Sequence, residues 1–257
     1  MSAPIQIETQ GFTRIVRIHR PQQKNALTHA MYTIMADTLE AAEQDASVRS
    51  ILFTGDADCF TAGNDLGEFA DGMPDSFEKT PVGRFLVALA TANKPVVAAV
   101  NGPAVGIGTT LLLHCDLALA GDNTRFQMPF VNLGLCPEGG SSLLLPRWLG
   151  RVRAMELLLL GRPFDAHEAL RLNLINRVCP PADTENEALA LCEQINAQPP
   201  AAIRTSKALF NRGQNEALLD TLLVEGRHFA ERLDSAEARE AFGAFREKRK
   251  ADFSQFD

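Results

Sequence analysis

One carboxylate stands out because its neighbours are apolar. Glu138 lies in Leu133-Gly-Leu-Cys-Pro-Glu-Gly-Gly-Ser-Ser-Leu-Leu-Leu-Pro146, between two apolar runs. If those runs are buried, Glu138 faces an apolar cavity, and desolvation raises its pKa above a usual value of about 4.3. A carboxylate tuned in this way can shuttle a proton near neutral pH. The alternative is a glutamate in the first turn of a helix that complements the helix dipole, with Pro137 beside it.

Two glycine-rich turns upstream could supply a complementary pair of free backbone amides. They are Phe60-Thr-Ala-Gly-Asn-Asp-Leu66 and Asn101-Gly-Pro-Ala-Val-Gly-Ile-Gly-Thr-Thr110. Each follows an apolar run and is expected to turn sharply from a strand into a helix, whose first amides have no partner within the helix. Two such amides aimed at one point form an oxyanion hole for an enolate or a tetrahedral intermediate. The alternative for each turn is an ordinary strand-to-helix connection.

The sequence lacks the motifs of nucleotide-binding, disulfide-bonded and metal-binding proteins. Gly102, Gly106 and Gly108 do not match the dinucleotide fingerprint G-x-G-x-x-G, and no phosphate-binding GK[ST] loop is present. The five cysteines include no CxxC pair, which favours reduced thiols over a disulfide framework. The five histidines show no metal-ligand spacing. We therefore expect no metal.

Composition and charge narrow the class of protein. A chain of 257 residues, 46% hydrophobic and 22% charged, suits one globular domain or a large domain with a small appendage. A net charge of -7 argues against a nucleic-acid partner. The absence of a long uncharged apolar stretch argues against a membrane span. Without a signal or transit pattern at the N-terminus, we expect a cytoplasmic protein.

Strands and helices alternate in the first half of the chain. Three apolar runs of strand length end in glycine, at 51–55, 96–102 and 117–121. A helix is expected from Thr28, as N-cap, to Asp45, and its apolar face comprises Met31, Ile34, Met35 and Leu39. Another helix begins at Thr80-Pro81. The alternation predicts an α/β architecture with mostly parallel strands.

The two ends of the chain read differently. Residues 5–10 and 13–19 alternate in polarity and predict an opening hairpin. After Gly150 the pattern is helical, with helices expected at 152–160, 166–172, 185–198, 201–210, 216–233 and 236–248. We therefore expect an α/β core over residues 1–195 and a helical C-terminal region over 196–257.

Several motifs together resemble the crotonase superfamily, the enoyl-CoA hydratase/isomerase proteins. They are Arg20-Pro-Gln-Gln-Lys-Asn-Ala-Leu27, Ala62-Gly-Asn-Asp-Leu66, Val100-Asn-Gly102 with the glycines that follow, and Ala244-Phe-Arg-Glu-Lys-Arg249. The resemblance implies a spiral of stacked ββα units and binding of acyl-coenzyme A thioesters. It also implies a homotrimer or a dimer of trimers formed through the C-terminal helices. No separate cofactor is implied, because coenzyme A is part of the substrate.

The resemblance also implies a set of site residues. The backbone amides of Asn64 and Ile107 would hold the thioester oxygen. The acyl-CoA-binding set comprises Lys24, Ala26, Ala62, Gly63, Asn64, Asp65, Leu66, Gly106, Phe130, Leu135, Phe245 and Lys248. Phe245 and Lys248 match tail positions that reach coenzyme A, often from a neighbouring subunit. For Lys24 and Lys248 the alternative is a solvated lysine, and for Phe130 it is a core aromatic. The acyl pocket would be lined by Leu66, Leu135 and the loop at 71–80.

One departure separates the chain from the hydratases. The two glutamates with which hydratases add water align with Thr110 and Phe130, and neither can act as a general base near neutral pH. With Pro137-Glu-Gly-Gly-Ser-Ser142, the chain is most similar to the Δ3,Δ2-enoyl-CoA isomerase branch. The resemblance implies an isomerase of fatty acid β-oxidation with Glu138 as its single proton shuttle. The alternatives are a hydratase, a ring-enoyl-CoA isomerase of aromatic-acid breakdown, and a non-catalytic acyl-CoA-binding subunit.

Overall fold

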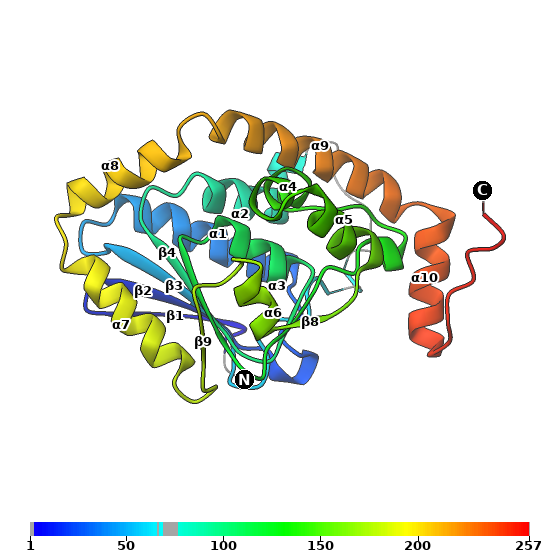
Figure 1. Cartoon of the computed structure of the whole chain (residues 1–257), viewed down its shortest axis with the longest axis horizontal. Coiled ribbons are helices and arrows are strands. Elements are labelled where there is room, and N and C mark those ends of the chain that lie inside the picture. The colour runs from blue at the N-terminus through cyan, green and yellow to red at the C-terminus, as the bar shows by residue number, and fades with distance from the viewer. Residues whose placement is uncertain (1–2, 66, 69–76, 257) are drawn as a thin grey trace.

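A six-stranded sheet in the order β1-β2-β3-β4-β6-β9 forms the centre of this computed structural model, which describes residues 3–65, 67–68 and 77–256 (Figure 1). Its strands are β1 (Ile5–Gln10), β2 (Thr13–Ile18), β3 (Ser50–Thr54), β4 (Val96–Val100), β6 (Leu117–Gly121) and β9 (Arg177–Cys179). The first two pair antiparallel, and all later neighbours pair parallel. The predicted hairpin and the three apolar strands are confirmed, whereas β9 was not predicted.

Helices cover both faces of this sheet. On one face lie α1 (His29–Gln44) and α2 (Pro81–Ala90), and on the other lies α7 (Thr184–Asn196). The side chains of β4 alternate between the two layers, so the whole strand is apolar because both of its faces are buried. Thr28 caps α1 and Thr80 caps α2, as predicted. Met31, Met35 and Leu39 form the buried stripe of α1 as predicted, whereas Ile34, predicted on the same face, lies at its edge and is 37% exposed.

A second, smaller sheet explains how the chain spirals. Its strands are β5 (Pro103–Val105), β7 (Arg125–Gln127) and β8 (Phe164–Asp165). β5 follows β4 and leads into α3 (Ile107–Thr110), and β7 follows β6 and leads into the 3-10 turn η5 (Val131–Leu133). Each spiral turn thus adds a long strand, a short strand and a helical segment, which confirms the stacked ββα architecture. The short strands were not predicted, because two or three residues carry no readable periodicity.

Helices dominate the remainder of the chain. They are α4 (Ser141–Leu149), α5 (Arg151–Leu160), α6 (Ala166–Arg171), α8 (Pro200–Asn211), α9 (Asn215–Leu233) and α10 (Ala236–Glu247), with 3-10 turns η1 (Pro21–Gln23), η3 (Phe77–Lys79) and η4 (Leu111–His114). The six helices predicted after Gly150 are confirmed to within two residues at each end. α4 was not predicted as an element. The division of the chain at residue 195 stays a prediction.

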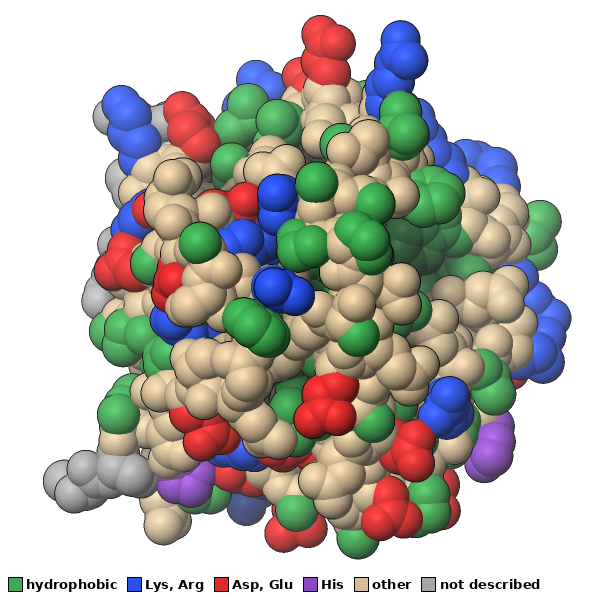
Figure 2. Space-filling model, turned by 90° about the vertical axis from the view of Figure 1, so that its left-hand side faces the viewer, with side chains coloured by type: hydrophobic (Ala, Val, Ile, Leu, Met, Phe, Trp, Pro, Cys, Tyr) green, Lys and Arg blue, Asp and Glu red, His purple; other side chains and the backbone are tan. Residues whose placement is uncertain are grey.

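The long helices after α7 frame one side of the molecule. α8 and α9 run across the top of Figure 1, and α10 turns down at its right edge beside the C-terminus. α9 packs against α2 and α4, so it forms part of the wall around the interior. Figure 2 shows one face of the surface, on which basic and acidic side chains are interspersed around a hollow edged by hydrophobic ones. Within the described part of the chain, no helix combines the length and apolar character that crossing a bilayer requires.

Candidate active site

Two backbone amides occupy equivalent places on adjacent turns of the spiral. Thr61 pairs with Ala104 in a parallel bridge, and Asn64 and Ile107 each follow three residues later. Among the hydrogen bonds between described residues, neither of these two amides is a donor. The register therefore brings two unpaired N–H groups together on neighbouring turns, as an oxyanion hole requires.

Local backbone geometry turns both amides away from other partners. Leu27 donates to the Gly63 carbonyl at 2.8 Å and accepts from the Asp65 amide at 2.9 Å, so the amide of Asn64 between them faces the other way. The first glycine turn was expected to lead into a helix, but at Asn64 it is a strand-like segment paired with Leu27. In the second turn, Gly106 has φ 56° and ψ -118°, a conformation open essentially to glycine alone, and it starts α3 at Ile107.

The side chain of Asn64 is held from α1. The hydroxyl of Tyr32 donates a hydrogen bond to Oδ1 of Asn64. Burial, and secondarily the charge of Glu138, raise the pKa of Tyr32 well above its usual value, so this hydroxyl remains a donor. Its ring packs against Phe85, with ring centroids 5.6 Å apart. Sequence analysis missed Tyr32, although it is the single tyrosine of the chain.

Glu138 is buried against α3, with 7% of its surface exposed. Desolvation raises its pKa from 4.5 to about 8, and the charge of Glu225 adds to this rise. The hydroxyl of Thr110, three residues beyond Ile107 in α3, donates to Oε1 of Glu138 at 2.5 Å and opposes the rise. Burial thus raises the pKa of this carboxyl as expected, and its neighbours include the hydroxyl of Thr110 and the charge of Glu225.

The alternative for Glu138, a residue in the first turn of a helix, does not describe this structure. α4 begins at Ser141, after Gly139 and Gly140 in left-handed conformations with φ 66° and 74°. A Cβ on Gly139 would lie 2.9 Å from Oγ1 of Thr110, so only glycine lets the loop approach α3 this closely. The imidazole of His114 donates from Nε2 to the Gly139 carbonyl at 2.8 Å, and burial lowers the pKa of His114 to about 4, which keeps it neutral.

A cavity of about 340 Å³ adjoins the two amides. Predicted site residues among those lining it are Ala62, Gly63, Asn64, Gly106, Ile107, Phe130, Leu135 and Phe245. Phe229, Leu233 and Phe242 from α9 and α10 add an apolar wall that sequence analysis missed. Phe130 is both a pocket wall and a core aromatic, since it lies edge-to-face with Phe229 at 6.5 Å between centroids. Phe245 reaches the cavity from this chain and is 66% exposed.

The remaining predicted residues are not lining residues of this cavity, and Glu138 is one of them: it lies behind the cavity wall, bonded to Thr110 of α3. The carbonyl of Lys24 accepts from the amide of Ala62 at 2.9 Å, while its side chain is exposed. Asp65 instead forms an ion pair with Arg20 at 2.6 Å, and this contact lowers the pKa of Asp65. Ala26 accepts from the same arginine through its carbonyl, and Lys248 is exposed at the end of α10. Leu66 and residues 71–76 lie outside the described residues.

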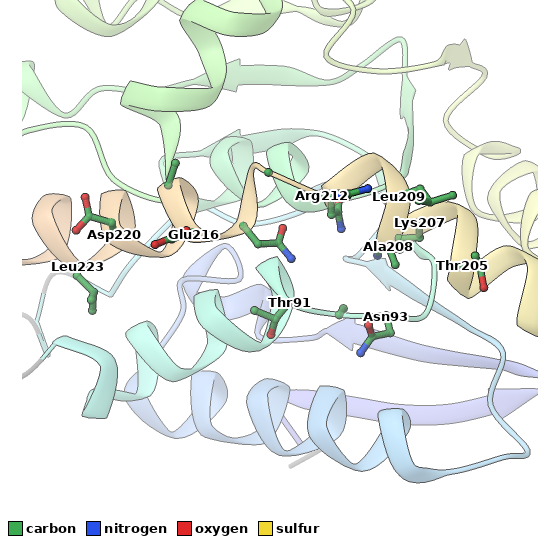
Figure 3. Close-up of a pocket in the computed structure, with 15 residues that line it drawn as sticks. Thr91, Asn93, Thr205, Lys207, Ala208, Leu209, Arg212, Glu216, Asp220 and Leu223 are labelled. Atoms are coloured by element: carbon green, nitrogen blue, oxygen red, sulfur yellow. The ribbon is translucent and has the colours of Figure 1, made fainter.

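A larger hollow of about 1060 Å³ shares no lining residue with this cavity. It lies between the end of α2 and helices α8 and α9; Figure 3 shows Lys207 and Arg212 toward its α8 end and Glu216 and Asp220 along α9. Lys207 is already paired with Asp116 at 2.6 Å. Across the described ranges, no group of three or more His, Cys, Asp or Glu side chains is arranged to hold a metal ion. The paired amides and Glu138 therefore remain the candidate active site.

Comparisons with known proteins agree with the geometry. A family model described as "Enoyl-CoA hydratase/isomerase" matches residues 8–256. A crystal structure of an enoyl-CoA hydratase/isomerase from Pseudoalteromonas atlantica T6c is 40% identical, with a TM-score of 0.93 and coverage of 98% of this chain and 100% of that one. The probable enoyl-CoA hydratase echA8 of Mycobacterium bovis is 34% identical, with 97% of each chain covered. Enoyl-CoA delta isomerase 2 of Rattus norvegicus is 35% identical over 84% of this chain and 56% of its own length.

Proposed function

The chain belongs to the enoyl-CoA hydratase/isomerase family, and from this membership we propose that it is a Δ3,Δ2-enoyl-CoA isomerase of fatty acid β-oxidation. The observation that carries the proposal is the setting of Glu138. This buried carboxylate has a pKa raised to about 8, and its hydrogen-bond partner is a threonine where the hydratase pattern has a glutamate. Within the part of the chain that the structure describes, the site thus offers one proton carrier.

The reaction needs one group that carries the proton and one site that stabilises the negative charge on the thioester oxygen. The thioester carbonyl acidifies the C2 proton, and Glu138 removes it. The negative charge that develops on the carbonyl oxygen is stabilised by the amides of Asn64 and Ile107. The same carboxyl group then delivers the proton to C4, so the double bond moves from C3–C4 to C2–C3 with no net gain or loss of atoms. Because the charge is held by backbone amides, the reaction requires no metal and no cofactor besides the coenzyme A of the substrate.

An apolar pocket favours this outcome over water addition. Phe130 is 4% exposed, and by the resemblance to the hydratases it aligns with the second of their glutamates. A dry site limits proton leakage and the addition of water to the product. Hydration is nevertheless the second candidate, because the similar Mycobacterium bovis protein carries that name. A ring-enoyl substrate and a purely binding role are the remaining alternatives.

Location and assembly belong to the same proposal. We propose a cytoplasmic homotrimer or dimer of trimers formed through the C-terminal helices. Leu209 and Phe210 of α8 are 63% and 78% exposed, and an interface along this helix would cover them.

A substrate comparison tests the proposed reaction. Purified protein is incubated separately with 3-enoyl-CoA and 2-enoyl-CoA thioesters, and the conjugated enoyl thioester is followed by its ultraviolet absorbance. We expect formation of 2-enoyl-CoA from the first substrate and little loss of absorbance from the second. Efficient hydration of 2-enoyl-CoA without isomerisation would instead assign the chain to the hydratases.

A further inference from the structure

A second buried glutamate lies directly behind the loop that carries Glu138. Glu225 belongs to α9, far from that loop in sequence, and is 6% exposed. Its Oε2 accepts from the amide of Gly140 at 2.6 Å, and its Oε1 accepts from the amide of Ser142 at 2.9 Å. The carboxylate therefore binds the free amides at the start of α4, which is where a helix favours a negative charge.

The loop between Glu138 and α4 is consequently held on both sides. His114 binds the carbonyl of Gly139, and Glu225 binds the amides of the next turn. The two consecutive glycines have no side chains that could anchor the loop by themselves. A carboxylate with two oxygen atoms can bind both amides at once, so it defines the direction in which the chain leaves Glu138.

We propose that Glu225 is a positioning residue for Glu138: it fixes the loop through two amides, and its negative charge disfavours a second charge on Glu138. The inference rests on the proposed function for its catalytic meaning, although the coupling of the two carboxyl groups is a property of the protein alone. Two buried carboxylates that interact raise each other's affinity for a proton.

The order in which the two groups ionise follows from their partners. Burial raises the pKa of both. Glu225 accepts two backbone amides in its charged form, whereas Glu138 accepts one hydroxyl. We therefore expect Glu225 to lose its proton at lower pH than Glu138, so that Glu138 titrates in the presence of a fixed negative neighbour.

The other titratable groups around Glu138 and Glu225 do not change charge in the pH range in which Glu138 titrates. Three other titratable groups stay neutral between about pH 6 and 9: Tyr32 of α1, His114 of η4 and Cys136 of the same loop. Burial raises the pKa of the tyrosine well above its usual value and that of the cysteine to about 11, and it lowers the pKa of the histidine to about 4. The other charged side chains on the elements packed around the pair are engaged elsewhere or lie at the surface. Arg232 of α9 pairs with Glu237, Lys207 of α8 pairs with Asp116, and Arg84 of α2 pairs with Asp37 and Glu40. Both charged residues of η3, Glu78 and Lys79, are at the surface.

The test compares Glu225→Gln with Glu231→Gln, a matched change on the exposed side of the same helix. In each protein the protonated carboxyl of Glu138 is followed by infrared spectroscopy through its C=O stretch, which is assigned by its loss in Glu138→Gln. We expect the titration midpoint to move to lower pH in Glu225→Gln and to stay at the wild-type value in Glu231→Gln. An unchanged midpoint in a folded Glu225→Gln variant overturns the proposal.

The pH profile of isomerisation is measured in the same proteins. Its acid limb should move to lower pH with the Glu225→Gln change, whereas a merely structural loss would reduce activity without moving the limb. If wild type does not isomerise 3-enoyl-CoA, the proposed function fails, but the infrared midpoints still decide the coupling.

A measurement on wild type alone keeps the inference testable if Glu225→Gln does not fold. Two buried carboxyl bands should then disappear in sequence, with the Glu138 band last. A band for protonated Glu225 that persists through the titration of Glu138 contradicts the proposal.

Discussion

The hydroxyl of Thr110 lies 2.5 Å from Oε1 of Glu138 and donates a hydrogen bond to it. The resemblance to the family implies a hydratase glutamate at the position of Thr110, so we propose that a neutral donor replaces a second acid here. The same short helix begins with Ile107, whose amide donates to no other residue that the structure describes. The proposed proton carrier and one amide of the proposed oxyanion hole are therefore joined through one turn of α3.

The raised pKa of Glu138 predicts the pH dependence of isomerisation. The carboxylate form must remove the C2 proton, so kcat/KM should rise with pH and level off above the free-enzyme pKa of about 8. Initial rates on 3-enoyl-CoA between pH 5 and 10 measure this limb. A plateau already reached near pH 5 would contradict the buried setting of the base.

The free energy of unfolding should fall as the pH rises, whereas kcat/KM should increase. The pKa of Glu138 is higher in the folded protein, at about 8, than its reference value of 4.5, so the folded state binds the proton more tightly. The contribution of Glu138 to the free energy of unfolding is fully present below about pH 4.5 and is lost as the pH rises through about 8. Its upper bound is about 5 kcal/mol. The unfolding free energy of wild type relative to Glu138→Gln should fall between pH 5 and 9. A constant difference would show that the carboxyl is not desolvated.

Removal of the Thr110 hydroxyl should make Glu138 harder to ionise. The hydrogen bond lowers the pKa of the carboxyl, so Thr110→Val should shift the acid limb of kcat/KM to higher pH and reduce the rate at neutral pH by about tenfold or more. Thr110→Ser keeps a donor and should retain most of the wild-type profile. Equal profiles for the valine and serine variants would exclude a role for the hydroxyl.

Tyr32 should act on catalysis through Asn64. Tyr32→Phe leaves the packing against Phe85 but removes the hydrogen bond to Asn64. We expect kcat to fall by about tenfold, because a loosened amide stabilises the enolate less well. Asn64→Ala removes the same bond from its other end, so the double variant should lose little more than either single one. Fully additive losses would show that the two side chains act independently.

The sequence predicts the elements of this fold better than it predicts their contacts. Apolar runs and caps placed β3, β4, α1 and α2, because local preference and burial agree there. Helix α4 was missed because Gly139 and Gly140 stand directly before it and Pro146 lies inside it, and all three are helix breakers by preference. Packing against α9 offsets the cost of the proline. The short strands were missed because their pairing partners are distant in sequence.

The site residues, too, could be predicted only where neighbouring residues in the sequence indicate them and not where they depend on contacts between distant segments. The apolar flanks of Glu138 favoured a perturbed carboxylate and left a helix-terminus alternative open, and two glycine turns indicated free amides. The choice of Asn64 and Ile107 as the amides, and of Glu138 as the single proton shuttle, came from the resemblance to the family. Tyr32 and Glu225 were not identified, because their roles depend on contacts with Asn64 and with the start of α4. A signal for Glu225 did exist: it occupies the buried stripe of α9 formed by Leu218, Leu222 and Phe229 at helical spacing.

The most direct measurement compares wild type and Glu138→Gln on 3-enoyl-CoA. Glutamine keeps the size of the side chain but cannot carry the proton, so kcat should fall by about 10²- to 10⁴-fold while the dissociation constant of a non-reactive acyl-CoA thioester stays near the wild-type value. Glu231→Gln serves as the control with an unchanged rate. Substantial isomerisation by Glu138→Gln would contradict the assignment of Glu138 as the proton shuttle.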